Sequence, residues 1–213
     1  MASILPTFAT LQQRYNDLVG EDTTSTADDV GQRHINRAIT DILNTHPFSW
    51  ALKTTTLTLA TGTASLPTDY NPLWGLNDAR IVVAGQDTDS VFTVIDREDR
   101  DNFATGDYVY YIDYNSSSDI YTFNTLTQTG SVVIYYYTIS TDLTVTTQKC
   151  IVPEIEAVCY LAAAKNWIGN ERNSELADIY KKEALERIEA LYIKDQKGES
   201  SIKKKLPNKE RAE

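Results

Sequence analysis

Cysteine, histidine and long apolar runs are scarce in this sequence. Only two of its 213 residues are cysteine. Cys150 and Cys159 are too few for a disulfide framework and lack the spacing of metal ligands, so we expect buried thiols in a reducing compartment. We find no signal-peptide pattern and no apolar run of the ~18 residues that a membrane span needs. These absences predict a soluble protein that is made in a cytoplasm and has no contact with a membrane.

Signatures of catalysis and metal binding are also missing. The chain has no G-x-S-x-G, P-loop, dinucleotide-binding or H-E-x-x-H pattern. Its two histidines, His34 and His46, lie at opposite ends of one predicted helix and could not share a metal ion unaided. Carboxylate pairs that hydrolyse glycosides are assembled in space, so the 30 acidic residues carry no information about them. We predict that the protein is not an enzyme and has no catalytic residue, metal or cofactor.

One acidic stretch resembles a calcium-binding loop. Residues 96–101 read Asp-Arg-Glu-Asp-Arg-Asp, without the glycine at the sixth position or the distal glutamate of such a loop. Its arginines would oppose a bound cation. We therefore expect an exposed, salt-bridged connector between strands, and ordinary turn residues at Asp87 and Asp89.

Charge is distributed unevenly along the chain, whose net charge is −10. Residues 194–213 contain seven Lys or Arg and four Asp or Glu, a local charge of +3, so residues 1–193 carry −13. An acidic body argues against nucleic acid wrapped on the general surface.

Helical periodicity marks both ends of the chain. Apolar residues recur at steps of three and four in residues 7–19 and 26–45, and again in two helices between Pro153 and Ile193. The first of these later helices begins at a proline, whose missing N–H would be unpaired there anyway. It is apolar on most of its circumference, which suits a helix buried among other helices.

Between the helical pairs the apolar period changes to two. The stretch LKTTTLTLATGTASLP from Leu52 predicts a strand and a turn. Separators with turn chemistry, GQDTDS, NSSSD and QTG, divide the sequence that follows. The further strands are predicted at residues 79–84, 91–95, 108–114, 120–124 and 131–140.

These elements predict an α+β fold. Two N-terminal and two C-terminal helices would form a four-helix bundle, interrupted by an antiparallel β domain and followed by an extended C-terminal tail. The predicted limits are 1–50 for the first helical pair, 51–148 for the β insertion, 149–194 for the second pair and 195–213 for the basic tail.

Tyrosine is concentrated in the β region, where eight of the 13 lie between Tyr108 and Tyr137. An apolar ring with a polar tip suits a protein interface or a carbohydrate platform, and cross-strand packing is the simpler alternative. We predict packing combined with a subunit interface that includes Tyr108, Tyr110, Tyr135 and Tyr137.

The C-terminal segment is polar and basic, and it cannot bury enough apolar surface to order by itself. Its Lys203, Lys204 and Lys205 lie between Ile202 and Leu206. This run could be a solvated tail, a weak contact to nucleic acid, or an arm that orders on a partner protein.

The order of features along nearly the whole chain carries a resemblance to a known family. Two helices precede an aromatic junction at residues 46–50 and a T-L-T…G-T…L-P-x-D-Y phrase at residues 56–70. After the strands come a proline-opened, alanine-rich helix, a helix with A-x-x-Y-x-x-E-A spacing at residues 177–184, and a basic tail. This arrangement resembles the head–tail connector (portal adaptor) proteins of tailed bacteriophages, particularly those of short-tailed phages.

The resemblance implies a virion protein, assembled in the host cytoplasm and located at the neck between capsid and tail. A homo-oligomeric ring, usually of twelve copies, would dock under the portal protein. Double-stranded DNA would pass through its channel without specific binding, since an acidic wall repels DNA and lets it slide. The helices would form the ring wall, and the β region would face the tail nozzle or a tail-tube protein.

The resemblance also implies roles for particular residues. Residues 197–213 would be the portal-binding arm, with Ile202 and Leu206 as apolar anchors and Lys203, Lys204 and Lys205 against acidic portal surface. The tyrosines would lie at subunit or nozzle contacts. Some members of the family carry a muramidase activity, but no residue here allows that activity to be transferred.

Three alternatives stay open at this point. The chain could be a stopper or tail-completion protein that contacts a tail tube. From a different class, it could be a carbohydrate-binding module lined by tyrosine, and third, a lysozyme-like enzyme.

Overall fold

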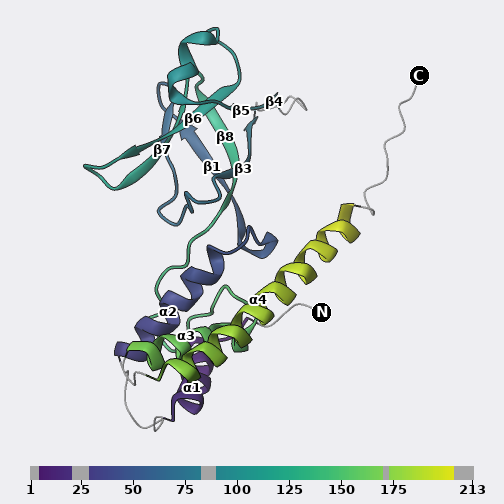
Figure 1. The fold of residues 1–213 in the computed structure, drawn as a ribbon. Coiled ribbons are helices and arrows are strands. Elements are labelled where there is room, and N and C mark those ends of the chain that lie inside the picture. Colours follow the sequence, from purple (N-terminus) through teal and green to yellow (C-terminus); the bar gives the residue numbers. More distant parts are fainter. Residues whose placement is uncertain (1–4, 21–28, 83–89, 170–172, 204–213) are drawn as a thin grey trace. The chain divides into compact units, whose positions relative to one another are not determined.

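The fold is α+β, as the sequence predicts, and the chain divides into two compact units. Met1–Ala51 and Ser140–Glu213 together form the helical unit, and Leu52–Ile139 forms the β unit. The β unit is thus an insertion in the sequence of the helical unit. The computed structural model (Figure 1) describes residues 5–20, 29–82, 90–169 and 173–203.

The β unit is shorter than the predicted insertion of 51–148, because residues 140–148 run along the helical unit. The N–H groups of Phe8 and Ala9 donate to the carbonyls of Gln148 and Thr146, over 2.8 and 3.0 Å. These bonds satisfy backbone groups of the first helical turn that have no partner within their own helix.

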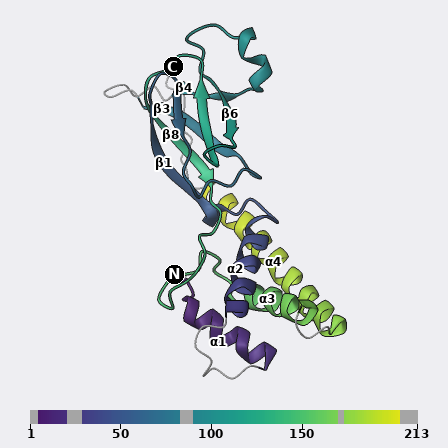
Figure 2. The same ribbon diagram turned by 90° about the vertical axis from the view of Figure 1, so that its left-hand side faces the viewer.

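Helices form where the apolar period of three to four predicts them. Thr7 caps the first helix by accepting a hydrogen bond from the N–H of Thr10, and Gly20 ends it in the left-handed conformation that glycine tolerates (φ 76°). The third helix contacts the other three, an arrangement that Figure 2 shows from a second side. The bounds are α1 Phe8–Val19, α2 Asp29–Leu43, α3 Ile155–Gly169 and α4 Ser174–Lys203, with a short 3₁₀ helix η1 at Ser49–Ala51.

Helix α3 is buried on most of its circumference. Small side chains allow neighbouring helices to approach it closely. Ion pairs at its surface link α3 to the first two helices. The Arg14 guanidinium of α1 binds the Glu156 carboxylate through two hydrogen bonds of 2.8 and 2.9 Å. The Lys165 ammonium lies 2.5 Å from the Asp41 carboxylate of α2. The buried residues of α3 are Ala157, Val158, Cys159, Ala162, Ala163, Ala164 and Asn166.

Helix α4 is longer than the sequence predicts. We expected the helix to end near Ile193 and an extended tail to follow from residue 195, but the helix continues to Lys203. The prediction was wrong here because it relied on apolar periodicity, whereas an exposed helix also forms from residues with good helix propensity such as Lys, Gln and Glu. Asp195 contributes a tertiary contact by accepting hydrogen bonds from the Ser49 N–H (2.7 Å) and hydroxyl (2.5 Å).

The β unit consists of two four-stranded sheets among the described residues. Sheet one has the strand order β1-β8-β3-β4, and sheet two has the order β2-β7-β6-β5. The strands are β1 Leu52–Leu59, β2 Thr63–Ser65, β3 Leu76–Val82, β4 Ser90–Val91, β5 Thr93–Val94, β6 Val109–Asn115, β7 Ile120–Thr125 and β8 Gly130–Tyr137.

One strand pairing departs from the predicted antiparallel domain. Strand β5 pairs with β6 in parallel, so sheet two is mixed. The chain passes from β4 in sheet one directly through Phe92 into β5 in sheet two. The 3₁₀ helix η2 (Arg97–Asn102) and the following loop lie between β5 and β6, and this non-hairpin connection lets the two strands point the same way.

The acidic stretch at residues 96–101 is the exposed connector that the sequence predicts. Arg97 pairs with Asp113 at 3.2 Å, and Arg100 lies 3.3 Å from Asp101. Asp87 and Asp89, the other predicted turn residues, lie outside the described residues.

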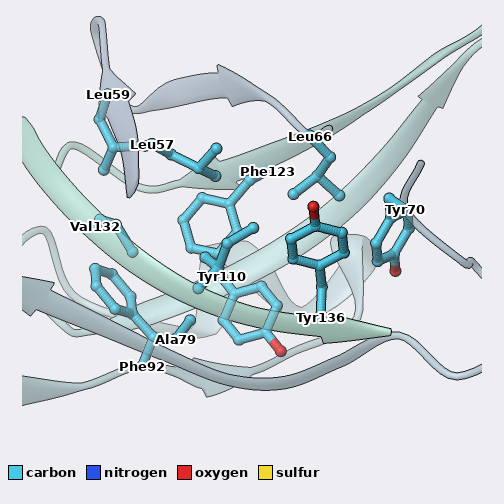
Figure 3. Close-up of a cluster of buried hydrophobic side chains, with 11 residues drawn as sticks. Leu57, Leu59, Leu66, Tyr70, Ala79, Phe92, Tyr110, Phe123, Val132 and Tyr136 are labelled. Carbon is cyan, nitrogen blue, oxygen red and sulfur yellow. The ribbon is translucent and has the colours of Figure 1, made fainter. Parts of the chain in front are cut away.

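The core of the β unit lies between the two sheets. On β8, Val132, Ile134 and Tyr136 point inward while their neighbours do not, as the period of two requires. The rings of Tyr110 and Phe123 stack at 4.9 Å, and Phe92 meets Phe123 edge to face (Figure 3). These aromatic side chains pack with aliphatic residues such as Leu57 and Ile134 in the core of this small unit.

Asp69 organises one end of this core. Its carboxylate accepts hydrogen bonds from the Tyr136 and Thr138 hydroxyls, both 2.9 Å long, and pairs with Lys53 at 2.6 Å. Burial by itself would raise the pKa of Asp69, but the bonds from Lys53, Thr138 and Tyr136 outweigh burial and lower it. Burial and the bond to Asp69 raise the pKa of Tyr136 to about 12.

We predict that Asp69→Asn destabilises the β unit by about 1–3 kcal/mol, because an amide cannot replace a partly buried carboxylate that accepts three hydrogen bonds. Since the folded-state pKa of Asp69 lies below its unfolded value, its contribution is present above about pH 4 and is lost as the pH falls through the folded pKa. Urea unfolding at several pH values measures both effects. The matched control is Asp119→Asn, because Asp119 is exposed and has a left-handed backbone (φ 54°) that Asn tolerates. Equal stability losses at the two sites would contradict the prediction.

Helix α2 approaches α1 closely at a glycine. A Cβ on Gly31 would lie 2.9 Å from Cε1 of Tyr15, whose side chain is buried and bonds His34 at 3.2 Å. We predict that Gly31→Ala lowers the free energy of unfolding by about 1 kcal/mol, because the overpacking cost of about 1–3 kcal/mol exceeds the gain in helix propensity of up to about 1 kcal/mol. Gly169→Ala in α3 is the control, since nothing lies within 4 Å of its Cβ position. Thermal unfolding followed by circular dichroism compares them, and a stabilised Gly31→Ala variant would refute the packing argument.

Candidate interaction surfaces

The aromatic junction after α2 is fastened to helix α4. The His46 ring stacks on Tyr192, with centroids 4.1 Å apart and planes 9° from parallel. Phe48 is fully buried and stacks on Trp50 at 4.6 Å. Together with the bonds from Ser49 to Asp195, these contacts fix the C-terminal half of α4 against the end of α2. The sequence identified the aromatic junction but gave no sign of its partner, which lies about 146 residues later in the chain.

An open groove of about 560 Å³ lies beside this junction, between the end of α2 and helix α4. We call it the α4 groove. Leu185 and Ile193 are 48% and 45% exposed along it, a large exposure for aliphatic side chains, and Glu189 lies 3.5 Å from the His46 imidazole at its edge. The sequence does not predict this groove, because helical periodicity alone cannot show where one helix extends beyond the helices packed against it. The lining residues are Thr45, His46, Leu185, Glu186, Ile188, Glu189, Ala190 and Ile193.

The predicted tyrosine interface separates into different environments. Tyr108 is exposed and meets Phe92 edge to face at 5.5 Å. Tyr135 and Tyr137 are half-buried and lie on the face of sheet one that points away from the core. Tyr110, however, is only 6% exposed and stacks on Phe123, so it belongs to the core and not to an interface. Alternation placed Tyr110 on one face of β6 but could not show that this face is covered by sheet one.

The outer face of sheet one carries few charges. Thr54, Thr56 and Thr58 of β1 are exposed there beside Tyr135 and Val133 of β8, as the register of the two strands shows. The one ion pair described on this face, between the Arg80 guanidinium and the Asp78 carboxylate, is local to β3 and 2.6 Å long. Because the protein is strongly acidic, such a face is unusual on its surface, and depletion of charge with retention of tyrosine is typical of protein interfaces.

Tyr114 is an exposed aromatic group that the predicted tyrosine interface omits. Its ring is 52% exposed and packs on Tyr121 at 4.9 Å, and its hydroxyl donates to the Asp119 carboxylate over 2.7 Å. The hydrogen bond to Asp119 raises the pKa of Tyr114. A ring held at both ends loses little conformational entropy when a partner covers it.

The predicted arm lies at the limit of the described structure. Ile202 and Lys203 are in the last turn of α4, while Lys204, Lys205 and Leu206 lie outside the described residues. The arm therefore begins as a helix.

The cysteines are buried and chemically quiet. Cys150 and Cys159 are both fully buried free thiols. Burial raises the pKa of Cys150 to about 12 and raises the pKa of Cys159 as well. Thiols so far from ionisation are poor nucleophiles at neutral pH.

No group of three or more His, Cys, Asp or Glu side chains among the described residues is placed to hold a metal ion. None of their helices combines the length and apolarity that a membrane crossing requires.

No curated protein matches the chain. A family model described as "SU10 adaptor protein" matches residues 6–206, from the start of α1 to just beyond the end of α4. That match covers both units and confirms the resemblance drawn from the order of the elements. The chain belongs to the SU10 adaptor protein family and is a bacteriophage head–tail adaptor.

Proposed function

We propose that the chain forms a ring, of twelve copies, between the portal protein and the tail of a short-tailed phage. The ring extends the DNA channel below the capsid and offers a docking surface to the tail nozzle. The observation that carries this proposal is helix α4, which starts in the packed helical unit, continues past its last described contact and leads into a basic segment.

The contacts of α4 support the portal-binding arm. Its first half packs on α3, and its contacts at Tyr192 and Asp195 reach the junction after α2. From Asp195 to Lys203 the helix extends for about 12 Å at 1.5 Å per residue. Gln196 and Lys197 are exposed at the start of this stretch. A helix that continues beyond Asp195 in this way carries the basic run, with Ile202 and Leu206 as anchors, to an acidic surface on the portal.

The negative charge of the helical unit supports a DNA channel. The helical unit without the basic segment, residues 1–51 and 140–193, contains 15 Asp or Glu and nine Lys or Arg, a charge of −6. A ring wall built from these units, as a bundle of four helices in each copy, therefore presents acidic surface to DNA. Such a wall repels the phosphate backbone and lets the duplex slide during ejection, whereas a basic wall would hold it.

The outer face of sheet one is suited to the contact between copies in the ring. Like-charged copies repel one another least where charges are absent or internally paired, and this face meets that condition. Tyr135 and Tyr137 supply aromatic groups on this face, and Tyr108 beside β6 of sheet two supplies another; interfaces favour such groups. In a closed ring each copy meets its neighbour through two different surfaces.

We predict that removing residues 204–213 weakens binding to the portal protein of the same phage by more than about tenfold, since an arm that orders on docking provides much of the interface. Replacing Lys203, Lys204 and Lys205 by Gln would lower the affinity less and make it less dependent on salt. Co-purification and titration with the portal measure both effects. Lys181→Gln with Lys182→Gln is the control, because it removes exposed charge from α4 far from the arm. Unchanged portal binding by the truncated chain would rule out the arm.

A further inference from the structure

The α4 groove combines an apolar floor with an acidic rim. Ile188 is buried at its base, and Leu185 and Ile193 flank it with nearly half of their surface exposed. Glu186 and Glu189 stand at the rim, and the Glu189 side chain is 59% exposed. Within the described residues, the only ion pair of these two glutamates joins Glu189 to His46. The groove thus suits an occupant that offers an apolar side chain next to cations.

The chain itself contains a segment of this chemistry outside the described residues. Residues 204–213 read Lys-Lys-Leu-Pro-Asn-Lys-Glu-Arg-Ala-Glu, with Leu206 directly after two lysines. This segment contains four Lys or Arg and two Asp or Glu, a charge of +2. It follows α4 immediately, so its point of attachment is known.

The length of chain between Lys203 and Leu206 determines whether this leucine can enter the groove of its own chain. From Lys203 back to Glu189, in the middle of the groove, the helix rises about 21 Å at 1.5 Å per residue. Leu206 is three residues beyond Lys203, and three extended residues span at most about 11 Å. Leu206 therefore falls short of the groove on its own helix, even before the chain has turned back.

We propose that the α4 groove binds the C-terminal segment of a second copy of this chain. Leu206 of one copy enters the apolar floor, and Lys204 and Lys205 lie against Glu186 and Glu189 of the other. The inference goes beyond the proposed function and does not require a portal. Because the same segment forms the proposed portal arm, the two contacts exclude each other, and the contact between copies belongs to the adaptor before it meets the portal.

Disulfide trapping between two single variants of the full chain tests this contact. One variant is Ala190→Cys, in the groove, and the other is Leu206→Cys, carrying a tag that changes its mass. Mixed without portal and oxidised, they should form mixed dimers about tenfold faster than a control mixture in which Asp178→Cys, an exposed position on α4 outside the groove, replaces Ala190→Cys. Introducing Glu186→Lys and Glu189→Lys beside Ala190→Cys should slow trapping several-fold, and high salt should slow the original pair.

Equal rates in the test and control mixtures would overturn the inference. So would a double variant, Ala190→Cys with Leu206→Cys, that closes its disulfide within one chain at high dilution, because the segment would then occupy its own groove. Adding the portal separates this inference from the proposed function. If portal added before oxidation leaves the rate of trapping unchanged, the contact between copies stands and the portal arm fails, whereas portal binding without trapped dimers has the reverse meaning.

Discussion

The helical unit depends on how completely helix α3 is enclosed. Its alanines and Cys159 leave neighbouring helices close to its axis, and larger side chains of α1 and α2 such as Leu11 and Ile39 fill the space around it. Dispersion and burial at such short separations are sensitive to one methyl group, as the approach of Gly31 to Tyr15 also shows. Ion pairs from Arg14 and Lys165 then select the orientation of α1 and α2 around it.

The β unit solves a different problem, because a small insertion must be stable with a limited core. Aromatic rings and aliphatic side chains share its core, and Asp69 accepts hydrogen bonds from the hydroxyls at the end of that core. The two units thus have separate cores, which allows surfaces on each to serve different partners. Charge separates these surfaces further: the outer face of sheet one is nearly neutral, while the α4 groove has an acidic rim.

Much of the fold could be predicted from periodicity, and the failures have physical reasons. The four helices and the longer strands are where spacing placed them, because each buries one face and must repeat its apolar residues accordingly. The parallel strand β5 has two residues, too few to show a period. The end of α4 was missed because residues with good helix propensity, such as Lys and Gln, form a helix without an apolar stripe. Tyr110 was assigned to a surface because alternation gives the face of a strand but not what covers it. The family resemblance came from the order of elements, which survives when motifs do not.

The bonds between Ser49 and Asp195 have a mechanical consequence. A load applied to the C-terminal end of α4 travels along a stiff helix and meets these bonds, together with the stacked rings of His46 and Tyr192, before it reaches the rest of the chain. The two residues are far apart in sequence, so the bonds shorten the path of the force to the segment that leads into the β unit. The hydrogen bonds and the ring stack would then share such a load at the junction, which directly precedes the β unit in the chain.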